Sequence, residues 1–168
     1  GIRGVGIDNI IICLGIIIGS LVVRSLMNTY LLDKIVSLTE KSETTLDDDI
    51  IESLRGPFGL IPIAFGLYLI TSYLPFSGSL DTLATNLVKM LVIYTIFSAL
   101  ANLTKPLLNL LSDNSWLTPA MTTWLSRVAG VLIWIVGITM ILDVWGIEIG
   151  PIIAGLGLFS VAVALGAQ

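Results

Sequence analysis

The sequence predicts an all-α membrane protein with about five transmembrane helices, and its composition and the length of its apolar runs both support this. Of the 168 residues, 55% are apolar and only 12% are charged, whereas a soluble domain carries about 25% charged residues. That leaves too little polar surface for a water-soluble globule, so the lipid bilayer is the natural solvent. The net charge of −4 and the lack of a basic stripe argue against a nucleic-acid partner.

The residue inventory also excludes several kinds of catalytic site. The chain has no histidine and one cysteine, Cys13, which rules out a histidine-containing zinc site, histidine acid–base catalysis and an internal disulfide. Cys13 lies inside an apolar run and is interpreted as a small packing residue. No nucleophile-elbow, zinc-protease or phosphate-loop motif occurs. We therefore expect no enzyme activity, no metal and no cofactor in this chain.

Five apolar stretches are long enough to cross the hydrocarbon core, which takes about 20 residues of helix. They cover Asn9–Asn28, Pro57–Tyr73, Thr82–Leu103, Thr122–Leu142 and Ile149–Gln168. The third stretch contains Lys89 and the fourth contains Arg127, whereas the fifth carries no charge.

Two of the links carry their own signals. Within the polar segment 33–55, Thr45-x-x-Asp48 reads as a capping box that begins a helix running into the second span. The three adjacent carboxylates Asp47–Asp49 suggest either a cation site or, more simply, a solvated helix start. Residues 104–121 predict a short amphipathic piece at the membrane surface, followed by a turn.

The placement of lysine and arginine predicts the topology, because short cytoplasmic links carry the excess of cations. The cations of the first and third links, with their flanks, are Arg24, Lys34, Lys41, Arg55, Lys105 and Arg127. The links 74–81 and 143–148 contain none. This alternation puts the N-terminus outside and the end of the fifth span inside. The positive charge of Arg3, which this topology places outside, is the one cation beyond the five predicted spans that disagrees with it.

The fifth stretch is rich in small residues, unlike an ordinary lipid-facing helix. Ala154, Gly157, Ser160, Ala162 and Ala164 fall on two faces of a helix, and small residues let helix backbones approach closely in a membrane. Val161 and Leu165 lie four residues apart on the stripe between those faces. In a ring of identical helices they would form an apolar constriction that gates by dewetting. The pattern alone leaves open a buried helix in a transporter-like bundle.

The order of residues in Ile153–Gln168 resembles the pore-lining helix of MscS-type small-conductance mechanosensitive channels. The similarity lies in Ala154, Leu156-Gly157, Ser160, the run Val161–Leu165 and Gln168, preceded by the lead-in Leu142-Asp143-x-x-Gly146-Ile147. The stretch Thr45–Asp48 is similar to the sequence before the second span in the five-span, YnaI-like subgroup of this family. Phe159 departs from the family, since a small residue is common there, and we expect it to face the outer spans.

The resemblance implies a homoheptamer in a membrane, by default the bacterial inner membrane, that opens under tension and releases ions and small solutes during osmotic downshock. It implies that Val161 and Leu165 form the seal, that Gly157, Ser160, Ala162 and Ala164 make helix contacts, and that Gln168 lies near a kink. The expected parts are an outer sensor (1–121), span four with its outer link (122–148) and the pore helix (149–168). A longer protein with a cytoplasmic domain is expected. A fragment of a secondary transporter and a membrane anchor remain as alternatives.

Overall fold

The computed structural model describes residues 6–31, 33–34, 37, 46–74, 76–112 and 116–168, and their regular structure is helical. Its long helices are α1 (Ile7–Leu26), α3 (Leu46–Tyr73), α4 (Ser79–Ser112) and α5 (Pro119–Val144). A π-helical turn, η1 (Met27–Leu31), extends α1, and a shorter helix, α6 (Gly150–Gly166), follows α5. The predicted fold class is confirmed, because four helices are long and apolar enough to cross a membrane and α6 is a shorter apolar helix.

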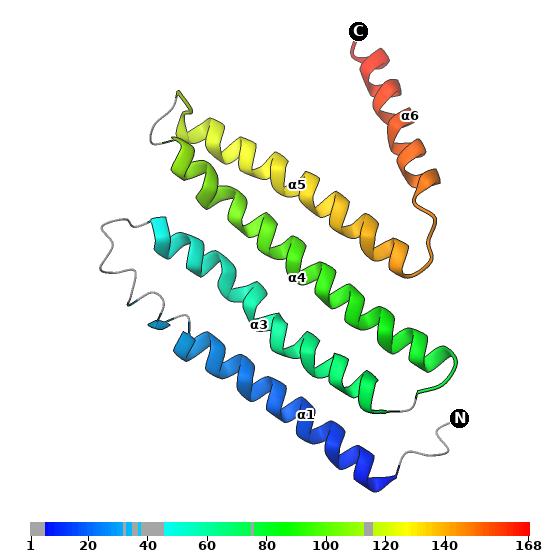
Figure 1. Ribbon diagram of the computed structural model, residues 1–168. Coiled ribbons are helices and arrows are strands. Elements are labelled where there is room, and N and C mark those ends of the chain that lie inside the picture. Colours follow the sequence, from blue (N-terminus) through cyan, green and yellow to red (C-terminus); the bar gives the residue numbers. More distant parts are fainter. Residues whose placement is uncertain (1–5, 32, 35–36, 38–45, 75, 113–115) are drawn as a thin grey trace.

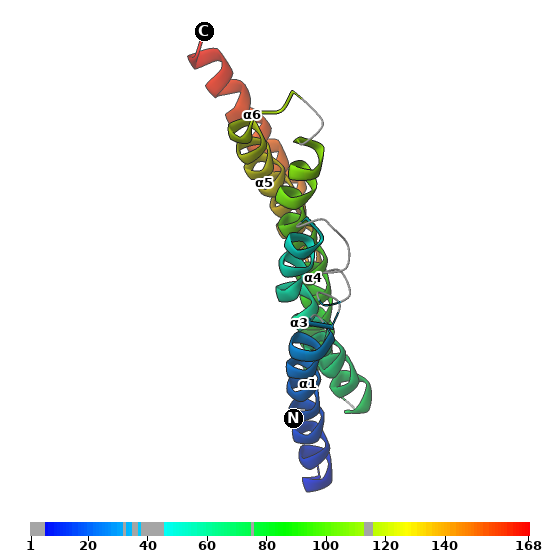
Figure 2. The same ribbon diagram turned by 90° about the vertical axis from the view of Figure 1, so that its left-hand side faces the viewer.

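The four long helices form one antiparallel layer in chain order (Figure 1). Seen edge-on, this layer is a single helix thick (Figure 2). Helix α3 contacts both α1 and α4, and α4 contacts both α3 and α5. The links 74–78 and 113–118 are short, and short links force consecutive helices to lie as antiparallel neighbours.

This four-helix layer has almost no interior. Among the described apolar residues other than glycine and proline, only Ala64 and Leu74 are buried. The accessible surface is 11476 Å², against about 8,000 Å² for a compact soluble protein of this mass. Both faces of the layer therefore present aliphatic side chains outward, as lipid contact requires.

The helices extend beyond the predicted spans in two places. Helix α3 begins at Leu46, so the acidic segment does run into the second span as expected, although Thr45 of the capping box lies outside the described residues. Residues 104–112 differ from the expectation, because they continue α4 through Pro106 and form no separate piece. The leucine-rich sequence has a high helix propensity, and this outweighs the one backbone hydrogen bond that the proline removes.

Close approach at glycine holds two of the helix pairs together. At Gly66 on α3, a β-carbon would meet the Oγ atom of Ser20 and lie 3.0 Å from its Cβ atom on α1. At Gly137 on α5, a β-carbon would lie 2.8 Å from the Phe97 ring of α4. Each contact exists because the glycine lacks a side chain, which is how helices pack where lipid supplies no hydrophobic drive.

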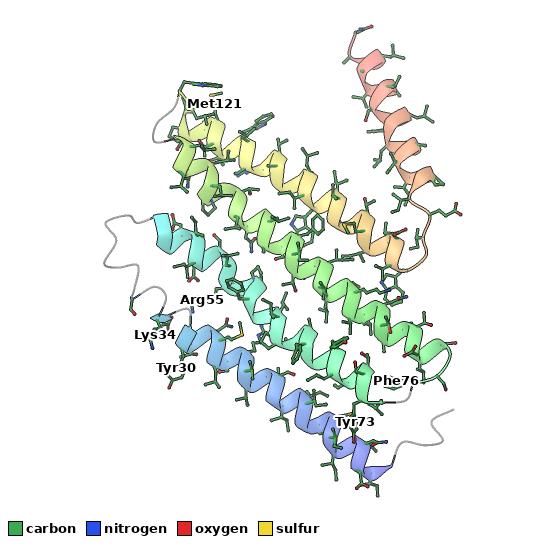
Figure 3. All side chains as sticks on the ribbon, viewed as in Figure 1. Tyr30, Lys34, Arg55, Tyr73, Phe76 and Met121 are labelled. Atoms are coloured by element: carbon green, nitrogen blue, oxygen red, sulfur yellow. The ribbon has the colours of Figure 1, made fainter. Side chains whose placement is uncertain are left out.

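An arginine links η1 to α3 at one edge of the layer. Arg55 donates to the backbone oxygen of Asn28 at 3.1 Å, to Asp33 at 3.2 Å and to Glu52 at 2.9 Å. The π-helical turn offers this carbonyl because its backbone bonding is irregular. Figure 3 shows Arg55 with Tyr30 and Lys34 at this edge, and Tyr73 and Phe76 at the opposite edge.

The cations gather at the Arg55 edge, where α1 and α4 end and α3 and α5 begin (Figure 1). All described lysines and arginines except Lys89 belong to this edge, whereas Asp8, Asp81, Asp143 and Glu148 mark the helix ends at the other. The antiparallel layer thus puts the helix ends that carry the described cations on one side, the arrangement on which the topology prediction depends.

Replacing Gly137 with valine should weaken the α4–α5 contact, because the new side chain overlaps the Phe97 ring. Overpacking of this kind costs about 1–3 kcal/mol. We expect a lower melting temperature of the purified protein in detergent. Gly130→Val on the same helix is the matched control, since a β-carbon there meets no atom within 4 Å. Equal melting temperatures for the two variants would contradict this packing.

Candidate functional site

Helix α6 is separated from α5 by a tight reversal of the chain. Ile147 N–H donates to the oxygen of Leu142 at 3.0 Å, and Gly146 N–H donates to the oxygen of Asp143 at 2.9 Å. These two bonds form a Schellman motif, which needs a left-handed residue after the helix. Gly146 provides it with φ +74°. The motif ends α5 and sends α6 in a new direction, away from the four-helix layer (Figure 1).

Helix α6 contacts none of the other described helices. All of its residues are exposed, including Val161 at 57%, Leu165 at 66% and Leu158 at 74%. It carries no charge and spans about 26 Å at 1.5 Å per residue. An apolar helix of this length that packs on none of the described residues has its neighbours elsewhere: in lipid, in another chain or in residues outside the described ranges.

No neighbouring residue in the described chain explains why α6 contains several glycines. A β-carbon at Gly155, Gly157 or Gly166 would meet no atom within 4 Å, whereas Gly66 and Gly137 lie against neighbouring helices. Glycine lowers helix stability by about 1 kcal/mol relative to alanine. Repeated glycines on an apolar helix therefore favour a close neighbour that is not among the described residues.

The regular helix places the predicted site residues on distinct faces. With about 100° of turn per residue, Val161 and Leu165 lie about 40° apart on one stripe. Gly157 and Ala164 flank that stripe on one side, with Ser160 further round, and Ala162 flanks it on the other. Ala154 lies on the stripe itself, one turn before Gly157.

The face opposite the stripe is bulky, and its residues are Ile152, Leu156, Phe159 and Val163. Phe159 lies about 160° from Val161. It therefore points away from the Val161–Leu165 stripe, and its expected contact with the outer spans stays a prediction, because α6 contacts none of the other described helices. The single chain brings none of the predicted seal side chains together, because every one of them stands on the same isolated helix.

Polar groups add little to α6. The hydroxyl of Ser160 donates to the backbone oxygen of Leu156 at 2.8 Å, so its hydrogen bond is satisfied and it acts sterically as a small residue. Helix α6 ends at Gly166, before Gln168. Among the described residues no group of three or more acidic, cysteine or histidine side chains is placed to hold a metal ion.

Sequence reasoning missed the structural role of Gly146. It appeared only as part of the lead-in to the last helix, yet its left-handed backbone decides where α5 ends. The available signal was a glycine directly after Asp143-Val-Trp at the end of an apolar run, which is the usual position for a helix C-cap.

Comparison with known proteins connects this site to a channel family. Residues 129–168 match the family model described as "Mechanosensitive ion channel, transmembrane helices 2/3", which covers most of α5 and all of α6. The whole chain is similar to the uncharacterised MscS family protein YhdY of Bacillus subtilis, with 24% identity over 170 residues. That alignment includes 96% of this chain and 46% of YhdY, so the chain spans about half of the relative's length. No solved structure matches.

Gly146→Ala should destabilise the α5–α6 reversal by about 1 kcal/mol, because a β-carbon disfavours the left-handed conformation. Gly146→Asn should be milder, since asparagine tolerates that conformation. We expect the melting temperatures to follow the order glycine, asparagine, alanine. An alanine variant at least as stable as the asparagine variant would show that the reversal does not depend on a positive φ.

Proposed function

Because this chain belongs to the MscS family of mechanosensitive channels, we propose that copies of α6 stand side by side around a water-accessible axis and line a tension-gated pore. One observation carries this proposal: an uncharged, glycine-bearing helix that packs on no other described part of its own chain. A ring of identical helices gives each α6 two neighbours and accounts for small residues on two faces.

In this ring the stripe between the two small faces points toward the axis. Val161 and Leu165 then form two stacked rings of aliphatic side chains. A narrow apolar constriction expels water, and an ion cannot enter without losing its hydration shell. The same geometry turns Leu156, Phe159 and Val163 outward, where lipid or the four-helix layer of the same or a neighbouring subunit lies.

Membrane tension acts on the difference in area between the closed and open conformers. A ring of α6 helices that tilt and separate occupies more membrane area, so tension shifts the population toward it. The four-helix layer presents both faces to lipid and is joined to α6 through the Gly146 reversal. The layer is therefore the element through which lipid changes the balance between the closed and the open conformer. The work supplied is the tension multiplied by the area gained.

The proposed setting follows from the charges and the family. The cation-rich edge of the layer lies in the cytoplasm of a bacterial cell, which puts the N-terminus outside and the end of α6 inside. The partners are further copies of the chain, seven by the family resemblance, together with membrane lipid and the permeating ions and small solutes. Their release relieves osmotic downshock.

The proposed division of labour follows the chain. The matched model names its segment as transmembrane helices 2 and 3, which makes α5 and α6 part of a common core, with α4 as the preceding helix. Residues 1–121 then act as the outer sensor, residues 122–148 as the fourth span with its outer link, and residues 149–168 as the pore helix. Helices α1 and α3 form the rim.

The alternatives find less support. A secondary transporter places paired ionisable groups or broken helices at its midplane. Here Lys89 is exposed and forms no ion pair among the described residues. A membrane anchor would explain the long helices, but it leaves the glycines of α6 without a cause.

Leu165→Ser should hydrate the seal and lower the tension needed for opening. Excised-patch recording under suction measures the threshold and the leak of the closed channel. Val163→Ser, the same kind of polar change two residues away on the opposite face, is the matched control and should leave both quantities near wild type. A larger effect at Val163 than at Leu165 would overturn the assigned lumen face.

Cysteines on the two flanks of the stripe should join neighbouring subunits. In a Cys13→Ser background, Ala162→Cys combined with Ala164→Cys should give, after mild oxidation in membranes, a ladder of covalent oligomers on non-reducing gels. The highest rung reports the subunit number. The pair Leu156→Cys and Val163→Cys lies on the outward face and should give no ladder. A ladder from the outward pair alone would reject the ring arrangement.

A further inference from the structure

A polar cleft of 330 Å³ lies between α3 and α4 near the cation-rich edge of the layer. Its lining includes Asp49, Glu52 and Ser53 on α3 and Asn102, Lys105 and Asn109 on α4. The buried ring of Pro106 is also part of the lining. The remaining described surface of these two helices is mainly aliphatic, so this cleft is chemically distinct from its surroundings.

The cleft lies at the level where both helices leave the apolar part of the membrane. No charge occurs between Gly56 and Leu80, and Asp49 precedes that stretch by two turns of α3. On α4, no charge occurs between Lys89 and Lys105, and four leucines follow Lys105 before the helix ends. The 34 residues of α4 span about 51 Å, well beyond the ~30 Å hydrocarbon core. The cleft therefore belongs to the headgroup layer.

One hydrogen bond sets Asp49 and Lys105 at the same depth. Asn102 Nδ2 donates to the backbone oxygen of Ser53 at 3.2 Å and fixes the register of the antiparallel pair. Because the two helices run in opposite directions, the residue three positions after Asn102 on α4 lies opposite the residue three positions before Ser53 on α3. Lys105 accordingly lies level with Ile50 and faces Asp49 across the cleft.

The two charges are not paired with each other. Glu52 is engaged by Arg55 at 2.9 Å, but neither Asp49 nor Lys105 has an ion-pair partner within 4.0 Å in the part of the chain that the structure describes. A carboxylate and an ammonium group thus line one cleft at one depth without closing onto each other. Such an arrangement is complementary to a ligand that carries both charges a few ångströms apart.

We propose that this cleft binds the phosphoethanolamine headgroup of a membrane phospholipid. The ammonium group of the lipid donates hydrogen bonds to the Asp49 carboxylate, and the phosphate accepts from the Lys105 ammonium group. The phosphorus–nitrogen axis of such a headgroup lies close to the plane of the membrane, which matches two protein charges at equal depth. The side-chain amides of Asn102 and Asn109 supply further donors for the phosphate oxygens.

The charge pattern separates this headgroup from the other common ones. A choline headgroup has no N–H group to donate to Asp49, and a glycerol headgroup has no positive charge at all. A divalent cation would gain from Asp49 but would be repelled by Lys105 in the same cleft. The proposal concerns lipid binding between α3 and α4, so it holds whether or not α6 forms a gated pore.

Native mass spectrometry of the purified protein tests this site. The probes are phosphatidylethanolamine, phosphatidylcholine and phosphatidylglycerol with identical acyl chains, each added to the protein in detergent. We expect the ethanolamine lipid to be retained at least about tenfold more than either other lipid, the ratio expected for one hydrogen bond to a charged group. Free phosphoethanolamine serves as a further arm and should bind far more weakly, because it lacks the acyl chains.

Asp49→Asn should abolish that preference, and Lys105→Met should lower the retention of all three lipids, because each of them carries the phosphate. The melting temperature should stay at the wild-type value in both variants. Lys89→Gln, which removes an exposed cation of α4 outside the cleft, is the matched control and should retain the preference. Equal retention of all three lipids by the wild-type protein would overturn the proposal. So would Mg²⁺ binding that depends on Asp49 without any preference for the ethanolamine lipid, a preference that survives Asp49→Asn, or lipid retention that Lys105→Met leaves unchanged.

Discussion

The structure depends on close contacts between helices in lipid, a solvent that provides no hydrophobic force for their association. In water, burial of aliphatic surface would collapse these helices into a globule, but hydrocarbon chains are as apolar as leucine and remove that force. The four-helix layer is held instead by local devices: glycines that admit a neighbour at Gly66 and Gly137, the tilted ring pair of Tyr94 and Trp134 with centroids 5.4 Å apart, and the Arg55 bonds at one edge. A layer one helix thick is stable on these terms, because lipid can cover both faces.

The same physics explains why α6 matters. Each long helix meets at least one neighbour through such a device, whereas α6 has small residues on two faces and meets none within the described chain. Its Schellman reversal directs it away from the layer, so its missing contacts are a consequence of the fold. A helix rich in small residues that has no partner among the described residues supports the proposed assembly of several copies, and its match to a mechanosensitive-channel family model supplies a reason for one.

Charge is organised along the membrane normal rather than around a catalytic centre. All described lysines and arginines except Lys89 share one edge of the layer, and the described acidic residues of the other edge stand at helix ends. The proposed orientation in the membrane depends on this ordering. It also gathers polar groups at the headgroup level between α3 and α4, where the cleft with Asp49 and Lys105 lies. Lipid can then act on the layer through its headgroups as well as through its acyl chains.

The local sequence was enough to predict the helical class, all five apolar segments and the stripe of Val161 and Leu165, because helix formation in lipid depends on short-range composition and a period of 3.6 residues. It also indicated the helix start in the acidic segment before α3. The run of α4 through Pro106 was not predictable, since the balance between one lost hydrogen bond and a leucine-rich helix is too fine to judge from residue types.

Only the tertiary structure decided which glycines meet a neighbour, that the long helices lie in one layer, and that α6 leaves that layer at Gly146. These features depend on distances between residues far apart in the chain, such as Phe97 and Gly137 or Ser53 and Asn102. A sequence records which residues are small and which are charged. The packing of helices against one another determines which of those residues end up face to face.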